Sequence, residues 1–316
     1  MTRSSIEWTD HVWNPTVGCS KVSPGCARCY AERFAKRLAA MGRPEYQGLV
    51  TEDGRWTGEV RCLPERLDQP LHWKKPARIF VDSMSDLFHH IIPVEFIAAV
   101  YARMMECTQH TFIVLTKRAE RAARLLRPGG LVHEIVAGIY QQADLAWPLP
   151  NVWFGVSVEN QAAADERIPL LLETPAAVRF VSCEPLLGPV DLKPAPLHQW
   201  PDLSCWMPNR DEPDDWKYWM HKWNGIHWVI VGGESGPGAR PMAYDWVDSI
   251  LDQCLKAGVP FFFKQWGEWY PSPFHGSRDF HGGYPYDQKT DTVRIGKKRS
   301  GRILDGRTWD QYPEMA

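Results

Sequence analysis

Short runs of apolar residues recur along the chain, and each run closes on a cluster of polar residues. Their cores are four or five apolar residues long, without the polar and apolar alternation of a strand that has one wet face. Such runs predict strands buried on both faces, as in a parallel sheet. Six segments have this pattern: 78–86, 111–118, 151–160, 178–185, 227–234 and 260–267.

Amphipathic patterns with helical spacing separate these runs. One covers 30–41, a second opens at Pro93, and a third ends at Gly258. The alternation of strands and helices predicts a parallel α/β fold. Because nearly every predicted strand ends in residues able to bind or react, the pattern favours a partial TIM-type (β/α)6 barrel, in which such residues converge on one mouth, over a doubly wound sheet.

Two segments fall outside this rhythm. Residues 191–226 are rich in Pro, Asp and Trp without a clear period, which predicts an insertion, a candidate lid, in a barrel domain spanning 1–270. Residues 271–316 form a C-terminal extension with a basic stretch at 294–302. Either a small β extension packed on the barrel or a mobile arm fits this composition.

Composition narrows the class of protein. With 316 residues, 44% apolar and 23% charged, the chain has the composition of a globular protein, and its apolar runs are far shorter than the roughly 20 residues of a membrane span. The first residues show no export signal, so we expect a cytoplasmic protein with no membrane partner. A net charge of −2 neither supports nor excludes nucleic acid as a ligand.

Three cysteines stand close together with the spacing Cys-x6-Cys-x2-Cys, at Cys19, Cys26 and Cys29, just before the first predicted helix. Three thiolates suit an iron–sulfur cluster that keeps one iron open for a small molecule. A closed zinc site needs a fourth ligand, which His11 or a distant residue would have to supply. A structural zinc site and a thiol loop without metal therefore remain the alternatives.

The segment 14–31, with its Asn-Pro, Gly-Cys and Cys-x-x-Cys-Tyr-Ala elements, resembles the cluster loop of radical S-adenosylmethionine (radical SAM) enzymes, especially the spore photoproduct lyase-like branch. Taken with five further motifs, it also resembles a phage-associated family of unknown function over most of residues 5–270. Those motifs are DSMSDLF (82–88), VSVEN (156–160), CEPLLGP (183–189), GGESG (232–236) and FKQWGEW (263–269).

The radical SAM resemblance implies a [4Fe-4S] cluster on Cys19, Cys26 and Cys29 inside a partial (β/α)6 barrel. S-adenosylmethionine would chelate the open iron through its amino and carboxylate groups. One electron, from a donor such as flavodoxin or ferredoxin, would cleave it to a 5′-deoxyadenosyl radical that takes hydrogen from the substrate. The photoproduct lyase and phage resemblances suggest a nucleobase or nucleic acid as that substrate.

This sequence departs from the radical SAM pattern at three points. The usual spacing is Cys-x3-Cys-x2-Cys, so three extra residues, among them Ser23-Pro24-Gly25, must bulge out. Arg28 stands where an aromatic residue usually packs near the adenine. The family's glycine-and-glutamate segment follows an early strand, whereas the one here follows a late strand, so its role is not transferred.

The polar strand ends supply the candidate cofactor-binding residues. The carboxylates suit ribose hydroxyls or the methionyl amine, and also metal chelation or proton transfer. The cationic side chains of Lys117, Arg118 and Lys264 suit an anionic group. The glycine-rich turn 232–238 has two interpretations. Its free backbone N–H groups could bind a phosphate or carboxylate, or it is a simple tight turn. The cofactor-binding candidates are Ser83, Ser157, Glu159, Glu184, Gly233, Glu234 and Lys264.

Two other function classes remain open at this stage. A zinc- or cluster-stabilised barrel could bind nucleic acid or a phage or host protein without turnover. A metal-dependent hydrolase could use the strand-end carboxylates, and its activity would survive loss of all three cysteines. Iron and acid-labile sulfide in anaerobically purified protein would separate the enzyme from the zinc-stabilised binding protein.

Overall fold

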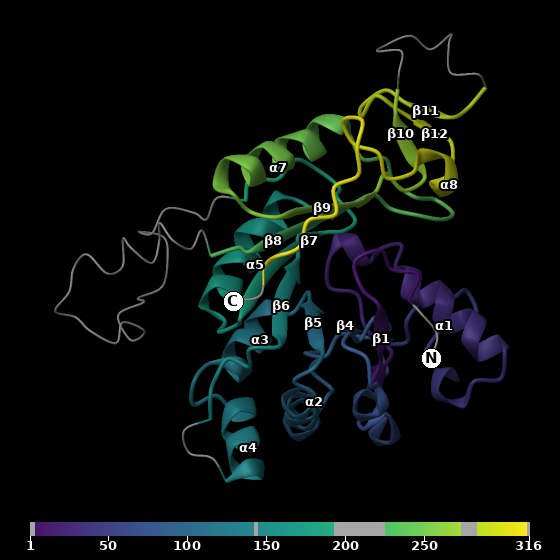
Figure 1. Cartoon of the computed structure of the whole chain (residues 1–316). Helices are drawn as coiled ribbons and strands as arrows, with labels where there is room; N and C mark the ends of the chain where they lie inside the picture. The colour runs from purple at the N-terminus through teal and green to yellow at the C-terminus, as the bar shows by residue number, and fades with distance from the viewer. Residues whose placement is uncertain (1–3, 142–144, 193–224, 273–282, 315–316) are drawn as a thin grey trace.

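A curled sheet of seven parallel strands forms the centre of the computed structural model, which describes residues 4–141, 145–192, 225–272 and 283–314 (Figure 1). Every neighbouring pair in this sheet is parallel, and the strand order follows the chain. The sheet is a half-barrel flanked by helices. Its strands are β1 (His11–Trp13), β4 (Arg78–Val81), β5 (Thr111–Thr116), β6 (Val152–Ser157), β7 (Val178–Cys183), β8 (Trp228–Gly232) and β9 (Phe261–Gln265).

The predicted α/β class and parallel sheet are confirmed, and each of the six predicted segments contains one strand. The predicted number of strands is wrong. β1 adds a seventh strand, which pairs in register with β4 from His11 opposite Ile79 to Trp13 opposite Val81. Three residues are too few to show a hydrophobic period, so the sequence pattern could not reveal this strand.

Alternate side chains along each strand fill two separate apolar layers. One set packs under the helices, and the other lies on the opposite face of the sheet, around the fully buried Trp228. Gly155 on β6 makes room in this second layer, because a Cβ there would lie 2.6 Å from the ring of Phe180. The second layer contains Trp8, Phe80, Ile113, Trp153, Val178, Phe180, Trp228, Ile230 and Phe262.

Helices connect the strands. The helices begin and end close to the predicted positions: Pro93 precedes the second main helix, and the last one stops at Gly258, whose φ of 66° lies in the left-handed region that glycine tolerates. Asn160 caps the helix that begins at Gln161, because its side-chain oxygen accepts a hydrogen bond from the Ala163 N–H at 3.0 Å. They are α1 (Tyr30–Ala40), α2 (Val94–Glu106), α3 (Ala119–Leu126), α4 (Leu131–Tyr140), α5 (Gln161–Glu173) and α7 (Tyr244–Ala257).

Smaller elements lie around this framework. A two-stranded pair, β2 (Thr16–Val17) with β3 (Arg61–Cys62), follows β1. Four 3-10 turns support the connections: η1 (Pro24–Cys26), η2 (Pro44–Tyr46), η3 (Pro64–Arg66) and η4 (Gln69–His72).

The C-terminal extension contains β structure, one of the two forms that its composition allows. An antiparallel sheet joins β10 (Trp269–Pro271), β12 (Thr292–Arg294) and β11 (Tyr286–Asp287), and α8 (Lys297–Ser300) follows. The chain then returns to the half-barrel, where Asp310 forms a β-bridge with Phe262.

Most of the predicted insertion at 191–226 lies outside the described residues. Within the described part of the chain, no helix is both long and apolar enough to cross a membrane.

Candidate functional site

A pocket of about 420 Å³ opens at the carboxyl ends of the strands of the half-barrel. The cysteine loop and the ends of β4 to β9 form most of its wall, and residues 5–8, Trp56 and Lys297 complete it. Nine of the ten residues predicted as cluster ligands or cofactor-binding groups line it: Cys19, Cys26, Cys29, Ser83, Ser157, Glu184, Gly233, Glu234 and Lys264. The tenth, Glu159, is fully buried next to the pocket wall.

The chain that leaves β1 is fastened to the end of β4, and this brings the cysteine loop over the pocket. The side-chain oxygen of Asn14 accepts bonds from Ser83 Oγ at 3.2 Å and from the Met84 N–H at 3.3 Å. Asp82 accepts from the N–H of Thr16 at 3.0 Å and from its hydroxyl at 2.9 Å. Burial raises the pKa of Asp82 to about 8, although the Thr16 bonds act in the opposite direction. The Asn-Pro-Thr segment is therefore a fixed connection.

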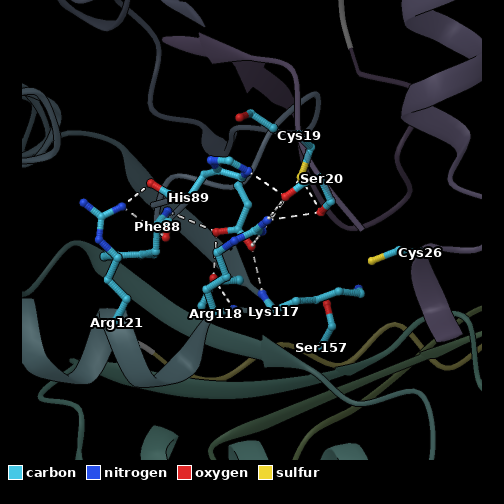
Figure 2. Close-up of polar contacts among 12 residues, drawn as sticks. Cys19, Ser20, Cys26, Phe88, His89, Lys117, Arg118, Arg121 and Ser157 are labelled. Carbon is cyan, nitrogen blue, oxygen red and sulfur yellow. Dashed lines mark hydrogen bonds and ion pairs between the residues drawn. The ribbon is translucent and has the colours of Figure 1, made fainter. Parts of the chain in front are cut away.

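A first ion pair holds the start of the cysteine loop, as Figure 2 shows. Arg118 and Asp86 lie 3.0 Å apart, and the guanidinium also donates to the backbone carbonyl and the hydroxyl of Ser20 at 3.1 and 2.9 Å. Its Nη1 lies 3.8 Å from the sulfur of Cys19. Burial raises the pKa of the Cys19 thiol to about 12, and Asp86 adds to this, whereas Arg118 lowers it.

A second ion pair holds the residues inserted between the first two cysteines. Glu159 and Arg167 lie 3.0 Å apart with side chains 0% and 3% exposed, and Glu159 also accepts from the Gly25 N–H at 3.3 Å. Burial would raise the pKa of Glu159, but a hydrogen bond from Ser23 and the charges of Lys117 and Arg167 bring it below its usual value. The carboxylate is therefore ionised and engaged with the loop.

A third ion pair reaches the same insertion from the end of β8. Glu234 and Arg240 lie 2.7 Å apart, and Arg240 donates to the backbone carbonyl of Pro24 at 3.0 Å. Pro24 and Gly25 of the insertion belong to η1, which these two ion pairs contact. Glu159 thus bonds the loop directly and Glu234 acts on it through Arg240, neither of which the sequence pattern predicts, while their cofactor-binding role stays a prediction.

The ends of β7 and β9 carry a different pair. Lys264 lies 2.8 Å from Glu184, which also accepts from the Trp8 indole N–H at 3.1 Å and from Ser182 Oγ at 3.2 Å. Burial would lower the pKa of Lys264, but the Glu184 charge raises it above its usual value. Both side chains line the pocket, so this part of the wall offers an ammonium and a carboxylate group side by side.

The sequence of the glycine-rich turn after β8 suggests free backbone N–H groups. At two positions of this turn, the N–H group already donates a hydrogen bond within the protein. The N–H of Gly233 donates to the Gln265 carbonyl and that of Gly236 to the Glu268 carboxylate, both at 2.9 Å. A Cβ at Gly233 would collide with the Trp266 carbonyl oxygen. This glycine is therefore required by the close approach of two strand ends.

Three side chains that build the site are absent from the residues predicted from the sequence. Arg167 and Arg240 complete the ion pairs described above, and the Tyr30 hydroxyl donates to the Ser83 carbonyl at 2.6 Å. Arg167 left a signal, because it lies between Ala164 and Leu171 on the buried face of its helix. An arginine on such a face predicts a buried acidic partner.

The described residues contain no group of three or more His, Cys, Asp or Glu side chains arranged to hold one metal ion. The three loop cysteines stand around the pocket wall, and each is half-buried. Burial raises the pKa of Cys29, and the neighbouring Cys26 adds to this effect. The thiols are therefore close enough to influence one another electrostatically.

Fold and site together define an α/β half-barrel protein with a cysteine-lined pocket at the carboxyl ends of its parallel strands. The chain belongs to the DUF5131 family, described as a protein of unknown function, whose family model matches residues 3–313. No curated protein and no solved structure matches the chain. The resemblance to a family of unknown function is thus supported, and these comparisons provide no link to radical SAM enzymes or to phages.

Proposed function

We propose that this protein is a radical SAM-type iron–sulfur enzyme. The observation that carries the proposal is that Cys19, Cys26 and Cys29 share one pocket with the polar ends of the parallel strands. On this view the half-barrel is a partial (β/α)6 barrel with one further strand. The proposed arrangement places a metal centre and a small-molecule cofactor next to each other.

The residues fit a [4Fe-4S] cluster. Cys19, Cys26 and Cys29 line the same pocket, and their thiolates would hold the cluster. The three ion pairs to the loop support the fit, because they hold the loop in place through protein contacts. With three cysteine ligands, the cluster would keep one iron open for a small molecule.

The remaining pocket suits S-adenosylmethionine. Its volume of about 420 Å³ falls in the range of small-molecule sites. Lys264 and Glu184 offer opposite charges to a zwitterionic amino acid group, and Ser83 and Ser157 offer hydroxyl groups. When bound, the cluster would supply the electron that cleaves S-adenosylmethionine to methionine and a 5′-deoxyadenosyl radical. The electron donor, flavodoxin or ferredoxin, and a nucleobase or nucleic acid substrate rest on the family resemblance alone.

A hydrolase that binds metal through strand-end carboxylates is less well supported. Glu159 is engaged by Arg167 and Gly25, and Glu234 is engaged by Arg240. Binding a metal at these carboxylates would leave two arginines without their acidic partners. The contacts therefore favour a site built on the cysteines.

The direct test is reductive cleavage of S-adenosylmethionine. Protein reconstituted anaerobically with iron and sulfide is reduced with dithionite, and 5′-deoxyadenosine is measured by chromatography. We expect 5′-deoxyadenosine from the intact protein and none from its Cys26→Ala variant. An intact, reducible cluster that neither forms this product nor binds S-adenosylmethionine in calorimetry would refute the enzyme and leave a cluster-containing binding protein.

A further inference from the structure

Arg118 is the residue that joins the end of β5 to the first cysteine of the loop. It stands two residues after the end of β5 and immediately before α3, and its guanidinium extends to the cysteine loop (Figure 2). Two donor nitrogens are used on the loop: Nη2 bonds both oxygens of Ser20, and Nη1 lies 3.8 Å from Cys19 Sγ. An N–H group on a cysteine sulfur is one of the contacts that tune iron–sulfur clusters.

Asp86 fixes the orientation of this guanidinium. Its carboxylate accepts bonds from the Thr116 hydroxyl at 2.7 Å and from the backbone N–H groups of Phe88 and Lys117, each at 3.0 Å. Arg118 Nη1 is a fourth donor, also at 3.0 Å. With the two side chains 11% and 8% exposed, neither can swing into solvent without breaking several bonds. The positive charge is therefore held at a constant position beside the sulfur.

We propose that Arg118 is a positioning residue that raises the reduction potential of the cluster through Cys19. The inference rests on the proposed function, because it requires a cluster on the three cysteines. In the reduction step the oxidised cluster takes one electron from the donor, no bond forms or breaks, and the guanidinium keeps its proton. The cluster becomes one charge more negative, and a nearby fixed cation stabilises that state more than the oxidised state.

The chain supplies a matched control one turn further along α3. Arg121 donates to the backbone carbonyls of Phe88, His89 and Ile92, and so fastens the same segment after β4 to the same helix. Figure 2 shows its guanidinium directed at this backbone, while that of Arg118 points to Ser20 and Cys19. Loss of Arg121 therefore loosens the local structure without removing the contact to sulfur.

The experiment is a redox titration of reconstituted protein, followed by the electron paramagnetic resonance (EPR) signal of the reduced cluster. At the midpoint potential of the wild-type protein, we expect the ratio of reduced to oxidised cluster to fall about tenfold in Arg118→Gln, equivalent to about 59 mV for one electron. Arg118→Lys, which keeps the charge without the fork of donors, should shift the midpoint in the same direction by less. Arg121→Gln should stay within about twofold of wild type.

Three results would overturn the inference. The first is an unchanged midpoint in Arg118→Gln with the cluster content intact. The second is an equal shift in Arg121→Gln, which would show that loosening of the segment causes the effect. The third is loss of the cluster from both Arg118 variants, which would limit Arg118 to assembly of the loop. A wild-type protein that takes up no cluster would instead refute the proposed function itself.

Discussion

Two charge pairs that line the pocket differ in what their cations contact. The Asp86–Arg118 pair uses its guanidinium on the cysteine loop, at Ser20 and Cys19. The Glu184–Lys264 pair receives bonds from Trp8 and Ser182, outside that loop. Arginine has five donors in a fixed fork and can bind an acid and a loop together, whereas the single ammonium of a lysine serves fewer partners.

The pairs therefore differ in whether they hold the cysteine loop or face the open pocket. The ion pairs at the ends of β5, β6 and β8 hold the cysteine loop through three arginines, and the bonds of those arginines are already made. The pair at β7 and β9, the two strands on either side of β8, presents its charges to the pocket without such bonds to the loop among the described residues. On the proposed function, the arginine pairs would support the cluster loop and the lysine pair would face the bound ligand.

The largest expected effect is on the metal centre. Cys26→Ala should abolish cluster assembly, because two thiolates leave a second iron of the cluster without a protein ligand. Iron and acid-labile sulfide measured after anaerobic reconstitution provide the readout. Cys62→Ala is the matched control, since Cys62 is half-buried in β3 outside the loop. A cluster content that falls equally in both variants would contradict the assignment of ligands.

The next largest expected effect is on the free energy of unfolding, compared between substitutions of Glu159 and Glu184. Glu159→Gln removes the partner of an almost fully buried arginine, so the free energy of unfolding should fall by about 3 kcal/mol. Glu184→Gln should cost less than about half of this, because the side chains of its pair are 16% and 19% exposed and can rehydrate. Denaturant unfolding of the protein without metal measures both. Equal losses would contradict the distinction between supporting and ligand-facing pairs.

A smaller effect concerns the order of the loop. Arg240→Gln removes the bond to the Pro24 carbonyl, so the amides of Ser23, Gly25 and Cys26 should exchange hydrogen several-fold faster in the protein without metal. Lys264→Gln removes a cation whose ion pair is with Glu184 and should leave these amides unchanged. Hydrogen exchange with mass spectrometry separates the outcomes. Faster exchange in both variants would mean that the Lys264 pair also holds the loop.

The last expected effect lies away from both pairs and concerns the dependence of stability on pH. Burial, assisted by the charge of Arg179, lowers the pKa of His227 from its ordinary value of 6.5 to about 4. The unfolded chain therefore takes up a proton between about pH 6.5 and pH 4 while the folded protein does not, so this group destabilises the fold as pH falls through that window. His227→Asn keeps an acceptor for the Arg179 N–H and should weaken that dependence. Identical pH profiles of the unfolding free energy would refute this.

The sequence predicts the framework of the molecule well because apolar runs and helical periods are local signals. Six strands and the main helices follow from them, and the polar strand ends lie at the pocket because parallel strands end on the same side. The three-residue β1 has no such period. The roles of Glu159 and Glu234 depend on partners such as Arg167, and single-residue patterns do not identify contacts between side chains.

The ligand assignment at Gly233 shows the same limit. A turn rich in glycine suggests free N–H groups. In the structure, glycine is required at this position because the Trp266 carbonyl leaves no room for a Cβ. This contact follows from the pairing of β8 with β9, which the sequence of the turn does not contain. The cysteine loop was the strongest local signal, because its residue types and spacing carry the chemistry themselves.

The most direct test of the proposed cluster enzyme is the EPR spectrum of anaerobically reconstituted, dithionite-reduced protein, recorded before and after addition of S-adenosylmethionine. The account predicts the signal of a reduced [4Fe-4S] cluster, absent from Cys26→Ala, whose shape changes when S-adenosylmethionine binds the open iron. A colourless protein that contains stoichiometric zinc and no iron would contradict it.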